Sequence, residues 1–288
     1  MASPSFERLD AMPGDRGAVR GGPVILSVPH AGRDYPPALV DALRVPPAAL
    51  HLLEDRFVDM VARAARDTQP TLIQRAPRAW IDLNRSEQER DPKVDAGADW
   101  STQPRASAKL RSGLGLVPRR TTAAGDLWRR RFSDAEVRAR IEGDHRPYHA
   151  ALAELLAAAR ARFGVAVLLD LHSMPPLGGE GAARIVLGDR FGKAAGARFM
   201  ARAEAEIRRF GIPVAVNTPY AGAHVLERHG APPRGIHAIQ LELDRSLYLD
   251  AALDQPGSGF GETVALVARL LSALADEALS AALPMAAE

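Results

Sequence analysis

Two short apolar runs that each lead into a histidine constrain the fold of this chain most strongly. Residues 23–30 (PVILSVPH) and 165–172 (VAVLLDLH) have the length and aliphatic content of strands buried on both faces. Turn-forming residues follow each run, Ala-Gly after His30 and Ser-Met-Pro-Pro after His172. If the two strands are parallel neighbours, both imidazoles lie at the carboxyl edge of one sheet, where open α/β sheets bind ligands. Two histidines held at one sheet edge are typical of a metal site.

Strand-like and helix-like segments alternate along most of the chain, which predicts an α/β fold. We expect one domain over residues 1–288, with a core at about 20–282 and a mixed or largely parallel twisted sheet flanked by helices. Beyond the two runs above, the expected strands are residues 71–75, 80–83, 183–187, 213–217 and 236–243. The expected helices are residues 38–44, 48–67, 133–164 with a capping box at its start and an interruption at Pro147, 191–210 and 262–279.

The composition excludes several classes of function. The 288 residues carry a formal net charge of only +2, and the arginines are scattered rather than gathered in a stripe, so we expect no nucleic-acid partner. The absence of cysteine means that any metal is held by histidine and carboxylate side chains. No apolar run approaches the roughly 18 residues of a membrane span, and residues 1–10 lack the apolar stretch of a secretory signal. We therefore expect a cytoplasmic protein with no membrane partner; the sequence carries no signature of an oligomeric state.

Residues 86–126 form a long polar segment with several prolines and glycines and no sustained period. Structureless segments of this length are uncommon in compact domains and are usually functional or disordered. Two interpretations stay open: a lid over a pocket, or an excursion on the surface.

Polar residues follow or interrupt several of the expected strands, where a core has no use for them. They are His30, the segment 82–85 (DLNR), His172 with Ser173, and Glu242. Each alone has a structural explanation, such as a hydrogen-bonded histidine or a buried ion pair. Together they favour a site, because buried charges are costly unless they are paired or bound to metal.

A catalytic zinc ion commonly takes three protein ligands and keeps one position for water. Glu54 and Asp55 are the candidate third ligands, since they follow the first strand closely in the chain; the alternative is a solvated helix face. No HExxH pair is present, so a metal would not bind through that helical motif.

Six segments in order resemble the N-formylglutamate amidohydrolase (N-formylglutamate deformylase) family. They are residues 27–32 with 35–37, 54–59, 80–85, 146–149, 169–173 and 235–242. The order and spacing agree from about residue 23 to 250, whereas residues 86–126 and 220–230 depart from the family pattern. The resemblance implies a phosphorylase/hydrolase-like α/β fold, related to the zinc carboxypeptidases, and a zinc-dependent amide hydrolase.

The resemblance also implies roles for individual residues. His30, His172 and Asp55 match the metal ligands, with Glu54 as the other candidate for the carboxylate. Glu242 matches the general base.

Further positions complete the expected site. Arg85 matches a clamp for a substrate carboxylate, and either Arg85 or Arg228 is the cation expected beside the developing oxyanion. His224, in the loop before the last strand, either contacts substrate or faces solvent. Asp82 or Asp170 is expected to orient a ligand histidine, or else is an inward charge without that contact.

The function that the resemblance implies is hydrolysis of N-formyl-L-glutamate, a small N-acyl amino acid, to formate and glutamate in histidine degradation. The alternatives are a hydrolase of another N-acyl amino acid or small peptide, and a non-catalytic binding protein on the same fold. Two histidines and a carboxylate suit zinc and several other divalent ions.

Overall fold

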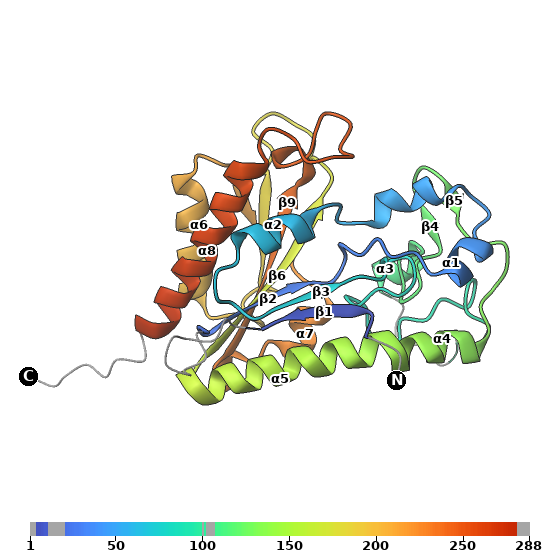
Figure 1. Ribbon diagram of the computed structural model, residues 1–288, viewed down its shortest axis with the longest axis horizontal. Helices are drawn as coiled ribbons and strands as arrows, with labels where there is room; N and C mark the ends of the chain where they lie inside the picture. The colour runs from blue at the N-terminus through green and yellow to red at the C-terminus, as the bar shows by residue number, and fades with distance from the viewer. Residues whose placement is uncertain (1–3, 11–20, 100, 102–106, 281–288) are drawn as a thin grey trace, which may run out of the picture. The chain divides into compact units, whose positions relative to one another are not determined.

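The computed structural model describes residues 4–10, 21–99, 101 and 107–280 (Figure 1). In chain order its elements are β1 (Phe6–Leu9), β2 (Val24–Val28), α1 (Pro37–Ala42), the 3₁₀ helix η1 (Pro47–Leu53), α2 (Val58–Ala65), β3 (Thr71–Gln74), α3 (Ala108–Arg111), β4 (Arg120–Thr121), β5 (Gly125–Asp126), α4 (Asp134–Arg140), the π-helical turn η2 (Ile141–His145), α5 (Arg146–Phe163), β6 (Ala166–Met174), β7 (Ile185–Gly188), α6 (Ala197–Arg209), β8 (Val214–Val216), α7 (His224–His229), η3 (Pro232–Arg234), β9 (Ile236–Asp244), η4 (Arg245–Leu247) and α8 (Phe260–Ser280).

The chain divides into two compact units, each assembled from separate segments. The first unit takes the described residues within Met1–Glu7, Pro29–Asp55 and Ile73–Ala151, and the second takes the rest. β1, β3 and α5 run from one unit into the other. The expectation of one domain over residues 1–288 stays a prediction, and its outermost residues, 1–3 and 281–288, lie outside the described part of the chain.

A seven-stranded sheet, in the order β1-β3-β2-β6-β9-β7-β8, organises the fold. β2, β6 and β9 are parallel neighbours, whereas β7 runs antiparallel to β9 and parallel to β8. Every residue of β2 and β6 is buried, as their continuous apolar sequences predict for central strands. The sheet is therefore mixed and mostly parallel, which confirms the predicted fold class.

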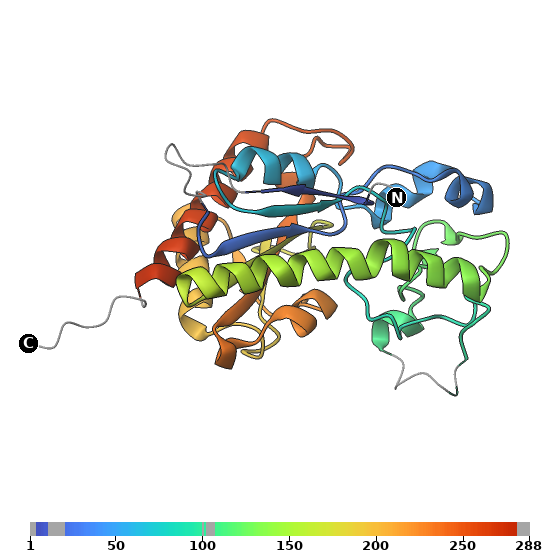
Figure 2. The same ribbon diagram turned by 60° about the horizontal axis from the view of Figure 1, so that its bottom comes forward.

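Helices of the second unit cover both faces of its strands. α2 and α8 pack against β2 and β6, and α6 lies beside α8 (Figure 1). α7 packs against β9, and in the turned view of Figure 2 α2 (light blue) lies above the strands and α7 (orange) below them. No helix among the described residues has the length and hydropathy needed to cross a membrane.

The first unit holds more irregular backbone. The predicted capping box is confirmed at the start of α4, where Ser133 and Glu136 each accept a hydrogen bond from the other's backbone N–H. The predicted interruption near Pro147 takes the form of the π-helical turn η2, which ends at His145, between α4 and α5. Residues 86–126 contain only α3, β4 and β5 within their described part; residues 100 and 102–106 lie outside it. The role of this segment as a lid stays a prediction.

The expectation of a helix over residues 48–67 is wrong, and the difference shapes the site. η1 ends at Leu53, and α2 begins only at Val58. Phe57 between them has a left-handed φ of 57°, and Glu54 is extended, so neither carboxylate lies on a helix face. Both short helices bury apolar residues, so the apolar period of the sequence continues through the break between them. The hydrophobic pattern therefore does not reveal the break.

Other boundaries also differ from the expectations. Residues 80–83 form turns rather than a strand, because Pro77 starts a turn that the Trp80 N–H closes. β6 continues two residues past His172, since β9 pairs with it as far as Met174. α6 starts at Ala197 rather than at 191, after two left-handed residues at Arg190 and Phe191. β1 and α7 were not expected.

Candidate functional site

The parallel ladder of the second unit places His172 on β6 directly opposite Glu242 on β9. Two residues earlier, Asp170 is opposite Gln240 in the same register. Because side chains alternate across a strand, these four residues share one face of the sheet. All four are buried, although their side chains are polar.

Hydrogen bonds orient His172 and Glu242 on this face. The His172 Nε2–H donates to Asp170 Oδ2 at 2.9 Å, and Ser27 on β2 donates to Asp170 Oδ1 at 2.7 Å. Gln240 Nε2 donates to Glu242 Oε1 at 2.9 Å. An ionised carboxylate only accepts hydrogen bonds, so this arrangement puts the His172 proton on Nε2 and leaves Nδ1 as the electron-pair donor. We call Asp170, His172, Gln240 and Glu242 the strand cluster.

α7 carries the other two expected site residues of the second unit. His224 is its first residue rather than part of a loop, which corrects the expectation, and Arg228 is exposed near its end. His229 lies on the same helix and is buried. Burial lowers the pKa of His229 to about 4, helped by the nearby charge of Arg228 and opposed by Asp170. His229 is therefore neutral at neutral pH.

In the first unit, His30 follows β2 by two residues and faces Asp55. The Asp55 N–H donates to the His30 carbonyl at 3.0 Å, and Asp55 Oδ2 lies 3.6 Å from His30 Nδ1. Both side chains are buried. Glu54, the other candidate carboxylate, accepts a hydrogen bond from the Tyr35 hydroxyl instead. Gly32 is required just beyond, because a Cβ there would collide with the Ala76 carbonyl.

Asp82 holds the other nitrogen of His30. The His30 Nε2–H donates to Asp82 Oδ1 at 2.7 Å, and Arg78 Nε donates to Asp82 Oδ2 at 2.8 Å. Burial by itself would raise the pKa of Asp82, but the charges of Arg78 and Arg85 and the contact with His30 hold that pKa well below 3.8. Asp82 is thus ionised and accepts from the imidazole. We call His30, Asp55, Asp82 and Arg85 the loop cluster.

Arg85 is a buried cation fixed by backbone acceptors. Its Nε donates to the Leu114 carbonyl at 2.8 Å and its Nη1 to the Asn84 carbonyl at 2.6 Å. Burial lowers the pKa of the Arg85 guanidinium, and Asp82, 3.9 Å away, opposes the shift. Among the described residues, no acceptor binds its Nη2.

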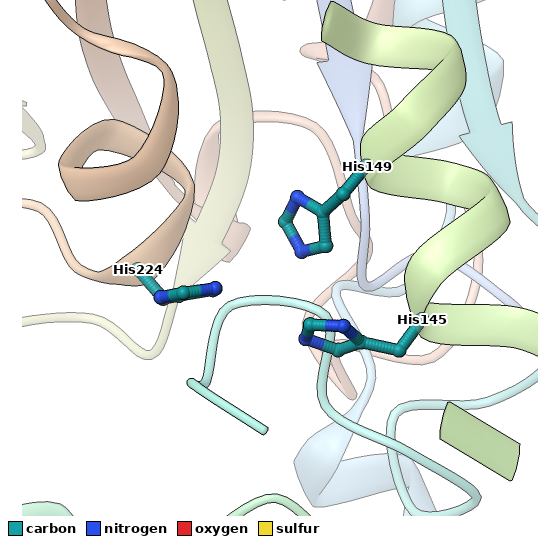
Figure 3. Close-up of side chains that lie close together, drawn as sticks. All are labelled: His145, His149 and His224. Carbon is teal, nitrogen blue, oxygen red and sulfur yellow. The ribbon is translucent and has the colours of Figure 1, made fainter. Parts of the chain in front are cut away.

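Two histidines of the first unit anchor the segment that carries Arg85. His145 Nε2 donates to the Arg85 carbonyl at 2.8 Å, and His149 Nε2 donates to the Leu83 carbonyl at 2.9 Å. Figure 3 shows both rings extending from successive turns on one side of the helix formed by η2 and α5. It also shows His224 at the start of α7. Both His145 and His149 are fully buried. The sequence feature that could have revealed this pair is its four-residue spacing, which places both histidines on one face of a helix.

Side chains able to ligate a metal ion therefore occur in both units, His30 and Asp55 in the first and His172 in the second. In both histidines Nε2 is bound to an aspartate, an arrangement typical of metal-ligating imidazoles.

Comparison with known proteins identifies the family. The model of the N-formylglutamate amidohydrolase family matches residues 22–249. The chain belongs to the N-formylglutamate amidohydrolase family. It is 30% identical to the N-formylglutamate deformylase of Pseudomonas aeruginosa over 236 residues, which cover 79% of this chain and 82% of that protein. It is also 30% identical to the N-formylglutamate deformylase of Pseudomonas putida over 234 residues, covering 79% and 82%.

Solved structures agree with this membership. The crystal structure of the N-formylglutamate amidohydrolase from Ralstonia eutropha JMP134 superposes with a TM-score of 0.79 at 31% identity, covering 96% of this chain and 97% of that one. A protein from Agrobacterium tumefaciens shares the fold, with a TM-score of 0.67 at 20% identity and coverage of 97% and 96%. The resemblance identified from six short segments is therefore confirmed.

Proposed function

We propose that this chain is a metal-dependent amide hydrolase that releases formate and glutamate from N-formyl-L-glutamate. Membership of the amidohydrolase family supports amide hydrolysis, and similarity to two proteins named as N-formylglutamate deformylases supports this substrate. The observation that carries the metal dependence is the repeated pairing of a buried histidine with a buried aspartate, His30 with Asp82 and His172 with Asp170.

The proposed ligands are His30, Asp55 and His172, each of which offers one ligand atom. The donor set fits zinc, because both imidazoles keep Nδ1 for the ion while Nε2 is bound to a carboxylate. The 3.6 Å between His30 Nδ1 and Asp55 Oδ2 is close to the roughly 3.4 Å that separates two ligands on a tetrahedral ion. This distance favours Asp55 over Glu54.

The strand register supports His172 as the third ligand. β2 and β6 are paired, with Ser27 opposite Asp170. The chain reaches His30 three residues after Ser27 and His172 two residues after Asp170, so both follow the same edge of the sheet.

When bound, the ion would lower the pKa of a water in the site toward about 7 and polarise the formyl carbonyl. Glu242 would take the proton of the attacking water and give it to the departing glutamate nitrogen as the amide C–N bond breaks. Gln240 holds one oxygen of this carboxylate in place. The products are formate and glutamate, with no net oxidation or reduction.

Arg85 would bind a carboxylate of the substrate through its Nη2 side, because Nε and one hydrogen of Nη1 are already donated to carbonyls. Arg228 and His224 are the other proposed substrate contacts.

The experiment that tests the function combines metal content with formate release. We expect about one zinc per chain by elemental analysis, formate release from N-formyl-L-glutamate, loss of release on chelation and recovery with zinc. N-formyl-L-leucine, which lacks the side-chain carboxylate, should be hydrolysed poorly. Bound metal with release of another acyl group would assign another N-acyl amino acid as substrate, and absence of both metal and activity would contradict the proposal.

A further inference from the structure

A concave site in the first unit is lined mainly by cations. The cavity has a volume of about 230 Å³, and its basic lining residues are Arg44, Lys93, Arg119, Arg129, Arg130 and Arg131. Asp126 is the one acidic residue that lines it. None of these residues takes part in the hydrolysis proposed above.

Backbone pairing builds one wall of this cavity. The Arg44 N–H donates to the Leu127 carbonyl at 2.9 Å, and the Arg129 N–H donates to the Ala42 carbonyl at 2.9 Å. An antiparallel bridge between Leu43 and Trp128 joins the same two segments. The two segments that carry Arg44 and Arg129, far apart in sequence, are therefore held side by side by main-chain hydrogen bonds.

Two of the six cations are neutralised by carboxylates. Arg119 binds Asp91 at 3.1 Å and Asp126 at 2.5 Å. Arg130 binds both oxygens of Glu136, at 2.9 and 2.6 Å.

The other four cations, Arg44, Lys93, Arg129 and Arg131, form no ion pair within the described part of the chain. Arg131 donates to a neutral acceptor, the Asp95 carbonyl, at 2.9 Å. Like charges gathered around one cavity repel each other, and a bound anion would remove that cost.

We propose that this cavity binds a small anion carrying phosphate groups. Arginine forks match phosphate oxygens in pairs, and three of the four cations without an ion pair are arginines. The cavity is concave and small, which fits a compact diphosphate-like anion rather than a polymer.

Titration calorimetry with inorganic pyrophosphate tests the proposal on the whole chain. The wild type should bind it saturably at one site, and Arg44→Gln/Arg129→Gln should weaken binding about tenfold or more, which corresponds to losing at least 1.4 kcal/mol. Lys193→Gln/Arg162→Gln, which removes two exposed cations of the second unit, is the matched control and should bind as the wild type does. Both pairs are exposed, and equal thermal midpoints would verify that the variants fold.

Three outcomes would overturn the proposal. They are absence of saturable binding to the wild type, equal weakening in both double variants, and tighter binding of citrate than of pyrophosphate, which would assign the cavity to carboxylates.

Discussion

The strand cluster and the loop cluster contain similar residues but are built in different ways. Every member of the strand cluster lies on β6 or β9, so the main-chain ladder sets its spacing. The loop cluster takes its members from turns and extended segments, and its geometry depends on side-chain bonds to Asp82.

The two clusters should therefore respond differently to substitution. In the strand cluster a substitution removes one group and leaves the ladder intact. In the loop cluster, removal of Asp82 takes away the carboxylate that contacts Arg78 and the buried Arg85, and a buried charge that loses its counter-charge is costly.

The largest expected effect tests the chemistry of the strand cluster. Glu242→Gln keeps the size of the side chain but cannot take a proton, so kcat for formate release should fall about 10²- to 10⁴-fold. Metal content should not change, because Glu242 is not a proposed ligand. Glu227→Gln, at an exposed carboxylate of α7, is the control and should retain activity. Full activity of Glu242→Gln would remove the glutamate from the mechanism.

Lowering the pH should reduce the free energy of unfolding through protonation of His229. Its folded pKa of about 4 lies below the usual 6.5, so protons bind more readily to the unfolded chain as the pH falls. The stability is present above pH 6.5 and is lost as the pH falls toward 4, by an amount of order 3 kcal/mol. Urea unfolding at a series of pH values should show this slope in the wild type and a flatter one in His229→Gln. Equal slopes would contradict the prediction.

The guanidinium of the loop cluster should control substrate affinity. Arg85→Gln should raise KM for N-formyl-L-glutamate about ten- to hundredfold, as expected for the loss of a charge-assisted hydrogen bond. Its effect on KM for N-formyl-L-leucine should be smaller, which separates loss of a clamp from general damage. Arg228→Gln is the matched comparison; a larger effect there would transfer the clamp to α7.

Substitution of the aspartates that accept hydrogen bonds from the two histidines allows a direct comparison of the clusters. Asp82→Asn and Asp170→Asn should each weaken zinc binding about ten- to hundredfold, because each orients a proposed ligand. Asp82→Asn should also lower the free energy of unfolding more than Asp170→Asn does, since two arginines lose their charge partner. Chelator competition and urea titration measure these two effects. Equal destabilisation would show that the clusters do not differ as described.

The sequence predicts more of the strand cluster than of the loop cluster. His172, Glu242 and, as one alternative, Asp170 are predicted from apolar runs and their polar interruptions, because burial and a period of two are local properties. The contact of Gln240 with Glu242 is known only from the structure. The parallel pairing of β2, β6 and β9 then follows from the α/β pattern.

The loop cluster was harder to predict because it depends on contacts distant in sequence. The break at Phe57 and the turn at residues 80–83 leave no trace in hydrophobic periodicity. His30, the segment 82–85 and the pair Glu54 and Asp55 are candidates from the residues alone, and the family resemblance implies their roles. The contacts of Asp82 with His30 and Arg78 are known only from the structure. α7 escaped detection since it has only six residues, fewer than a periodic pattern needs.

The smallest expected effect tests how far the strand cluster extends across the sheet. Ser27→Ala removes the hydrogen bond to Asp170 Oδ1, so it should cost about 1 kcal/mol of stability and weaken zinc binding several-fold through His172. Ser246→Ala removes a similar bond, from Ser246 Oγ to Asp244 Oδ1 at 2.7 Å, beyond the end of β9. This control should lose stability but keep its zinc affinity. If Ser27→Ala also keeps its zinc affinity, the strand cluster ends at Asp170 and β2 supports only the fold.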